Sequence, residues 1–269
     1  MEQYLKGRAV LFNEGSQFSC PDSCERYGCQ EPNLHVSISL VDLVGISVTI
    51  GRKIPDLYEK DCKVGFDPLQ GKDPWLGRVS LELRKPCSFL DGKVCSVYSG
   101  RPIACALFPE FDFMVGNRES LIKREIFRNY PCIQSPCSIS PQRKEILNHL
   151  MEMSVKEAFL SDFYLFGVSP FLIDLKNIAG EGLEGVILSD KGKAKIPHSR
   201  LEGLLLQKMK NGDYLEEWKA KIERLDRIEA LNLSKEMKRV TDQMALSADR
   251  MGPRIAYQFD GNKLLPIHL

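Results

Sequence analysis

The segment from residue 86 to residue 109, PCSFLDGKVCSVYSGRPIACALFP, decides how we expect this chain to fold. Its Asp91-Gly92 pair separates two short segments rich in strand-forming residues. An Asp-Gly pair in that position is a strong signal for a β-hairpin. Because a hairpin reverses the chain, we expect Cys87 and Cys95 to lie close together.

A short helix is expected directly after the hairpin. Arg101-Pro102 opens the apolar stretch 103–108, and proline is tolerated in a first helical turn because its missing N–H has no partner there. Pro109 ends the stretch. This helix carries Cys105, which can face back toward the hairpin.

Cysteine is the informative residue type in this chain. An odd count of nine, with no apolar export signal in the first 19 residues, does not suit a disulfide framework and indicates a reducing, cytoplasmic location. All nine lie between residues 20 and 137: Cys20, Cys24, Cys29, Cys62, Cys87, Cys95, Cys105, Cys132 and Cys137.

Thiols gathered in such numbers indicate a metal site. Thiolate sulfur is a soft ligand that favours zinc, iron–sulfur clusters or copper over magnesium or calcium. Cys62 is isolated behind a charged run, so we expect an ordinary buried thiol there. The candidate metal ligands are Cys20, Cys24, Cys29, Cys87, Cys95, Cys105, Cys132 and Cys137. Eight thiols can fill two tetrahedral sites, or one cluster with thiols to spare.

The segment 86–109 resembles the signature of the YkgJ-type, or CxxCxxCC, cysteine-cluster family. The resemblance extends over roughly residues 18 to 137 and implies a zinc- or iron-chelating domain, with an acidic residue like Asp42 on a helix pair. One feature departs from the family pattern. The family has closely spaced pairs ending in adjacent cysteines, whereas here the first cluster is spaced Cys-x3-Cys-x4-Cys. The upstream ligands therefore stay open.

Two classes of function follow from this resemblance. The family includes flagellin lysine methylases, which implies a 4Fe–4S cluster and S-adenosylmethionine-dependent methylation of protein lysines. In the other class, zinc or iron braces a domain that binds a protein partner and needs no open coordination position. The first class predicts an enzyme with an open iron position and the second a closed site, so the sequence leaves enzyme activity undecided.

The rest of the chain predicts an α+β protein: a small cysteine-rich metal-binding domain of short helices and a β-hairpin over 1–140, then a mostly helical region over 141–269. Apolar residues at helical spacing predict helices within 146–159, 215–228 and 237–251. The predicted elements before residue 90 are two short helices at 40–46 and 54–58, the first capped by Ser39, and an alternating strand at 79–83. A second small hairpin is expected over 186–196.

Charge and hydropathy limit the partners. There are 37 basic and 36 acidic residues among 269, and the two halves are each close to neutral, which disfavours nucleic-acid binding. We find no uninterrupted apolar run of the roughly 20 residues that a transmembrane helix needs, so no membrane association is expected. The expected partners are a metal ion and a protein partner or protein substrate.

Three further features contain residue types that occur in binding sites. The glycines of 180–185 match G-x-G-x-x-G, but two glutamates would repel a pyrophosphate, so we expect a plain loop. His35 is the one histidine near the cysteine region. Arg101 could donate hydrogen bonds to cluster thiolates or to an anion, or it could pair with Asp91 or Glu110.

Overall fold

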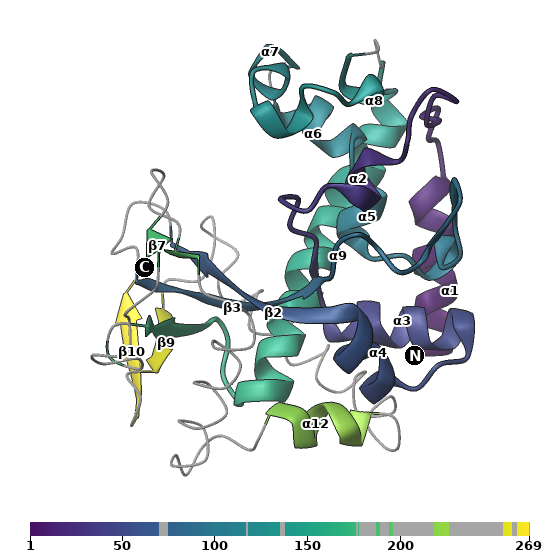
Figure 1. Ribbon diagram of the computed structural model, residues 1–269. Helices are drawn as coiled ribbons and strands as arrows, with labels where there is room; N and C mark the ends of the chain where they lie inside the picture. Colours follow the sequence, from purple (N-terminus) through teal and green to yellow (C-terminus); the bar gives the residue numbers. More distant parts are fainter. Residues whose placement is uncertain are drawn as a thin grey trace. The chain divides into compact units, whose positions relative to one another are not determined.

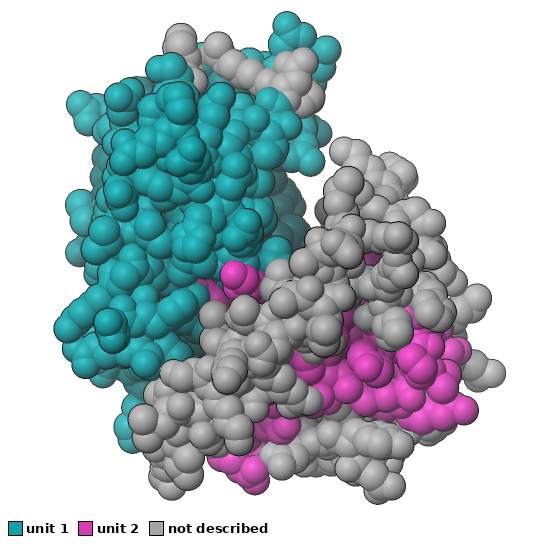
Figure 2. Space-filling model, turned by 180° about the vertical axis from the view of Figure 1, so that it is seen from behind, with its two compact units in different colours: residues 1–61, 83–155 teal, residues 62–82, 156–269 magenta. Residues whose placement is uncertain are grey.

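The computed structural model describes residues 1–69, 75–116, 118–134, 138–175, 177, 187–188, 194–195, 218–225, 255–259 and 263–268. The chain forms two compact units, coloured separately in Figure 2. Unit 1 comprises residues 1–61 and 83–155, and unit 2 comprises residues 62–82 and 156–269. The sequence-based boundary at residue 140 rests on cysteine content, whereas these units are defined by packing.

Unit 1 is built mainly of short helices, with one small hairpin (Figure 1). Its elements, in chain order, are α1 (Glu2–Asn13), α2 (Tyr27–Gln30), β1 (Ser37–Ile38), α3 (Leu40–Ile50), α4 (Ile54–Asp61), β4 (Leu90–Asp91), β5 (Val94–Cys95), η1 (Tyr98–Gly100), α5 (Ile103–Leu107), α6 (Glu110–Val115), α7 (Arg118–Ile122), η2 (Glu125–Phe127), α8 (Pro131–Gln134) and α9 (Pro141–Phe166). The chain of α9 continues from unit 1 into unit 2.

The start of α3 is fixed by a reciprocal cap. The Ser39 hydroxyl accepts a hydrogen bond from the Asp42 N–H, and the Asp42 carboxylate accepts one from the Ser39 N–H. Such a capping box satisfies two donors that a helix start otherwise leaves without partners. Gly51 ends the helix with a positive φ of 67°, which glycine adopts without steric cost. The predicted cap at Ser39 is confirmed.

Asp42 also joins α3 to two other helices. Its buried carboxylate pairs with the guanidinium of Arg8 on α1 and accepts a hydrogen bond of 3.1 Å from the N–H of Ile103, the first residue of α5. One carboxylate therefore connects α1, α3 and α5.

The core of this helical frame is apolar. Phe12 of α1 packs against residues of α5 and α9, and the buried set is Phe12, Ile103, Ala106, Leu107, Leu147, Leu150 and Met153. Burying side chains of this kind stabilises a fold by roughly 1.5–3 kcal/mol each.

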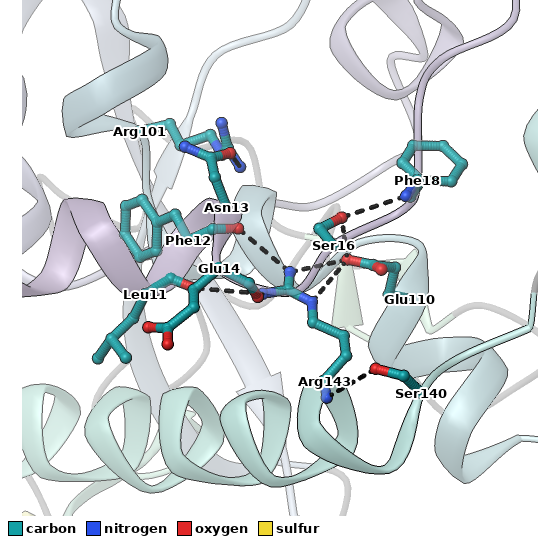
Figure 3. Close-up of polar contacts among 10 residues, drawn as sticks. All are labelled: Leu11, Phe12, Asn13, Glu14, Ser16, Phe18, Arg101, Glu110, Ser140 and Arg143. Atoms are coloured by element: carbon teal, nitrogen blue, oxygen red, sulfur yellow. Dashed lines mark hydrogen bonds and ion pairs between the residues drawn. The ribbon is translucent and has the colours of Figure 1, made fainter.

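Arg143 of α9 fixes the C-terminal end of α1 (Figure 3). Its buried guanidinium donates to the backbone carbonyls of Leu11, Phe12 and Glu14 at 2.9–3.1 Å. The same guanidinium pairs with the Glu110 carboxylate at 2.7 Å. Carbonyls at a helix end lack partners within the helix, so a buried cation there is favourable.

The Glu110 carboxylate extends this network toward the first cysteine (Figure 3). It accepts a hydrogen bond of 3.0 Å from the Ser16 hydroxyl, which itself accepts one of 3.2 Å from the Phe18 N–H. These hydrogen bonds fix the position of the segment that leads from α1 to Cys20.

Unit 2 contains the sheet. Its elements are β2 (Cys62–Pro68), β3 (Leu76–Leu83, whose last residue belongs to unit 1), β6 (Phe171–Asp174), β7 (Ile187–Leu188), β8 (Ala194–Lys195), α12 (Trp218–Leu225), β9 (Ile255–Phe259) and β10 (Leu264–His268). β3 pairs with β2 and β6, β6 pairs in parallel with β9, and β9 pairs antiparallel with β10.

A buried carboxylate also organises unit 2. Asp162 accepts hydrogen bonds from Arg78 of β3, the Ser169 hydroxyl and the Phe171 N–H at 3.0–3.2 Å. These bonds position the start of β6, where Phe171 stacks on Phe166 with a centroid distance of 3.8 Å. Burial raises the pKa of Asp162, and the Arg78 charge and the three hydrogen bonds oppose that rise.

The α+β fold class is confirmed. The hairpin at Asp91-Gly92, the helices beginning at Leu40 and Ile54 and the small pairing of β7 with β8 all form as expected. The predicted helix 237–251 and the glycine segment 180–185 lie outside the described residues. Within the described part of 141–269, β6, β9 and β10 are strands that the sequence analysis did not predict.

In the part of the chain that the structure describes, no helix combines the length and apolar character needed to cross a membrane.

We predict that Asp42→Ala lowers the free energy of unfolding by about 3–5 kcal/mol, because it removes the carboxylate that pairs with the buried Arg8 cation. Urea unfolding followed by circular dichroism measures this. Ser39→Ala is the matched control, since it removes only a cap hydroxyl and costs about 1 kcal/mol. Equal losses in the two variants would contradict the central role of Asp42.

Candidate metal centre

The hairpin and the first cysteine loop are joined by backbone hydrogen bonds. In the hairpin Leu90 lies opposite Cys95, and the Leu90 N–H donates to the Cys87 carbonyl at 3.1 Å. The Cys87 N–H donates to the Cys29 carbonyl at 2.8 Å. Cys29 is therefore fixed beside Cys87, although the two are far apart in the sequence.

Side chains strengthen this junction. The Arg26 Nε donates to the Lys93 carbonyl at 2.9 Å, and Lys93 Nζ donates to the Asp22 carbonyl at 2.9 Å. Lys93 also pairs with Glu25 at 3.2 Å. Arg26 has a φ of 58°, a left-handed conformation that costs a residue with a Cβ roughly 1–2 kcal/mol. The loop that carries Cys20, Cys24 and Cys29 is thus held against the hairpin in a defined conformation.

Four thiols form the first group, which we call the four-thiol group: Cys29, Cys87, Cys95 and Cys105. Burial raises the pKa of Cys29 to about 11, and the neighbouring Cys87 and Cys95 add to the rise. The pKa of Cys105 is raised for the same reasons, by burial and then by Cys29 and Cys87. A negative charge on one of these thiols raises the pKa of its neighbours, which requires the thiols to lie near one another.

Lys85 supplies positive charge to this group. Its Nζ donates to the Gly28 carbonyl at 2.5 Å, which places the ammonium beside the loop that carries Cys29. Although burial keeps the pKa of Cys29 and Cys105 high, the Lys85 charge lowers both in part. A fixed cation of this kind favours the thiolate form that binds metal.

Three thiols form the second group, the three-thiol group: Cys20, Cys24 and Cys132. Cys24 is only 3% exposed, and it adds to the rise that burial causes in the pKa of Cys20. Burial raises the pKa of Cys132 to about 12, with further contributions from Cys24 and Cys20. Cys20 also acts on Cys29, so the two groups are neighbours.

An aromatic cluster adjoins the three-thiol group. Tyr130 stacks on Tyr27 with a centroid distance of 5.5 Å, and its ring makes edge contacts with Phe127 and Phe108 at 5.3 and 6.2 Å. Cys132 belongs to the same buried cluster. Tyr27 and Tyr130 each lie two positions before a cysteine, so their stacking draws the segments of Cys29 and Cys132 together.

The structure thus gathers seven of the eight predicted ligands in unit 1, and Cys137 lies outside the described residues. Cys62, which we expected to be an ordinary buried thiol, is 2% exposed in β2 and belongs to unit 2. Its burial is confirmed.

Arg101 packs on an aromatic ring and donates a hydrogen bond to a side-chain amide. Its guanidinium lies over the Tyr98 ring at 3.8 Å and donates to the Asn13 Oδ1 at 3.2 Å, whereas Glu110 pairs with Arg143. Burial raises the pKa of Cys95, and the charge of Arg101 opposes that rise. Arg101 therefore acts on the four-thiol group through its charge.

Among the residues that the structure describes, no three Cys, His, Asp or Glu side chains are arranged so that they could hold a metal ion. The thiols share a neighbourhood, and coordination would need their side chains to turn toward a common centre. His35, the one histidine near the cysteine region, is exposed.

Sequence reasoning missed two residues of this centre. Lys85 and Tyr130 each lie two positions before a candidate ligand, Cys87 and Cys132. That spacing is the only signal the sequence offers, because the contact of Lys85 with Gly28 and the stacking of Tyr130 on Tyr27 join distant segments.

Comparison with protein-family models, with curated protein sequences and with solved structures gives no match to this chain. The resemblance to the cysteine-cluster family is an expectation from the sequence alone.

The raised thiol pKa values predict a pH dependence for the reduced, metal-free protein. A thiol with a higher pKa in the folded state binds its proton more tightly there than in the unfolded chain. Its stabilising contribution is complete below about pH 9 and is lost as the pH rises toward 11–12. We therefore expect the free energy of unfolding, measured with urea and a chelator, to fall between pH 8.5 and pH 11.

The double variant Cys29→Ser with Cys132→Ser controls for the lysines and tyrosines that titrate in the same range. Its unfolding free energy should depend less steeply on pH than that of the native chain. An identical pH dependence would show that these thiols have ordinary pKa values in the folded protein.

Proposed function

We propose that unit 1 binds zinc or iron, including iron in a 4Fe–4S cluster, through its cysteine side chains. One observation carries this proposal: seven cysteines from separate stretches of the chain lie in unit 1, where Cys29 is fixed beside Cys87 and Cys132 is buried with Tyr130. A hydrophobic core alone gives no reason for so many thiols to gather in one place.

The chemistry of the donors supports zinc or iron. Sulfur donors favour these metals, and the usual minimum is four thiolates around one centre. The four-thiol group would hold such a centre through Cys29, Cys87, Cys95 and Cys105. Deprotonating several buried thiols together is unfavourable because the thiolates repel one another, and a metal cation offsets that repulsion. Zinc would brace the fold there, and an iron–sulfur cluster would supply electron transfer.

The three-thiol group distinguishes the two classes of function, the closed structural site and the enzyme with an open metal position. Three thiolates leave one position of a tetrahedral metal to another ligand. Cys137, which the sequence marks as a candidate, would close the site and make it structural. An open position would instead suit an S-adenosylmethionine-dependent protein lysine methylase, the second candidate function.

Cys87→Ala tests the four-thiol group. We expect the variant to lose its share of bound metal, measured by plasma mass spectrometry, because it removes a ligand fixed next to Cys29. We also expect the unfolding free energy to fall by about 3 kcal/mol or more, since a structural zinc site contributes roughly 10 kcal/mol of binding free energy. We expect the same losses of metal and of unfolding free energy for Cys95→Ala.

Cys62→Ala is the matched control for both variants. It also removes a buried thiol, but from β2 of unit 2, so it should lose packing and keep the full metal content. Unchanged metal in Cys87→Ala and Cys95→Ala would exclude the hairpin from the site. A loss of metal in Cys62→Ala would make Cys62 a ligand.

Cys137→Ala separates the two function classes. We expect this variant to lose the metal of the three-thiol group while it retains that of the four-thiol group, as a fourth thiolate ligand would require. Metal content by plasma mass spectrometry is the measurement. Full retention of metal would show that the fourth position is open and would favour the enzyme.

A further inference from the structure

The hydroxyl of Tyr130 is buried, and the residue belongs to the same buried cluster as Cys132. The Tyr130 side chain is 2% exposed, and its hydroxyl oxygen has no hydrogen-bond partner among the described residues. A buried hydroxyl without a partner is unfavourable, because it has given up its hydrogen bonds to water. Such a group calls for a physical reason, and a functional role is one of the recognised reasons.

The ring has little freedom to bring this hydroxyl to solvent. It is stacked on Tyr27 and flanked by the edges of Phe127 and Phe108. The Tyr130 carbonyl accepts hydrogen bonds from the N–H groups of Ile133 and Gln134, which fixes the backbone on both sides of Cys132. Ring and thiol are thus held in one rigid segment.

The groups around the hydroxyl are acceptors. A phenol carries its proton at neutral pH and can donate a hydrogen bond. The groups whose charges act on this phenol are Glu31, Cys132, Cys24 and Cys29. The Glu31 carboxylate already accepts two hydrogen bonds of 3.1 Å from Asn33. The sulfur atoms remain as the acceptors that metal binding would turn into thiolates.

We propose that Tyr130 is a positioning residue of the metal centre, whose buried hydroxyl donates a hydrogen bond to a metal-bound thiolate of the three-thiol group. This inference rests on the proposed metal binding. A donor to a thiolate withdraws electron density from sulfur, which makes the bound thiolate less reactive toward electrophiles and slows loss of the metal.

Tyr130→Phe tests the proposal, because it removes only the hydroxyl and keeps the stacked ring. The native and variant chains are purified with their metal, and N-ethylmaleimide is added to alkylate the bound thiolates. Metal release is followed with pyridylazoresorcinol for zinc or ferrozine for iron. We expect equal starting metal content and release about fivefold faster in the variant, the change that one hydrogen bond of about 1 kcal/mol produces.

Tyr27→Phe is the control, since it keeps the other ring of the stacked pair and should release metal at the native rate. A second readout separates positioning from packing. In the metal-free protein Tyr130→Phe should not lower the melting temperature, because the hydroxyl has no partner there.

The possible outcomes are distinct. Equal release rates for native protein and Tyr130→Phe, both loaded with metal, would overturn this inference and leave the proposed function standing. A native chain that carries no metal would overturn the proposed function itself. A loss of stability in metal-free Tyr130→Phe would assign the hydroxyl to packing.

Discussion

The arrangement of the helices in unit 1 depends on the buried carboxylate of Asp42, because this one charged group contacts three of them. It caps α3, pairs with Arg8 of α1 and accepts from the first N–H of α5. A carboxylate buried with a cation and two backbone donors is stable only when all of them are in place. Asp42 therefore positions α1, which leads to the loop of Cys20, together with α5, which carries Cys105.

The surroundings of Cys29 and Cys132, in contrast, favour the protonated thiol. Burial and mutual repulsion raise the pKa of Cys29 and Cys132 to about 11 and about 12, while Lys85 and Arg101 supply fixed positive charge near the four-thiol group. This balance suits a site that exchanges protons for a metal ion. The chain provides the donors and part of the compensating charge, and the metal would supply the remainder.

Local elements of the fold could be predicted from the sequence, and long-range pairings could not. Ser39 as a cap and Asp91-Gly92 as a turn act through neighbouring residues, so their patterns are readable. The parallel pairing of β6 with β9 joins segments about 80 residues apart, and no local pattern specifies it. The same reason explains the site. The cysteines and their spacing marked the candidate ligands, but the bond from Cys87 to Cys29 and the stacking of Tyr130 on Tyr27 bring their segments together.

Metal content tests this account most directly. The native chain would be purified without oxygen and without a metal-binding tag, then measured by plasma mass spectrometry together with its absorption spectrum and its melting temperature with and without a chelator. The account predicts at least one zinc or iron per chain and a lower melting temperature after chelation. A folded chain free of zinc and iron, which melts at the same temperature in either condition and takes up neither metal, would contradict it.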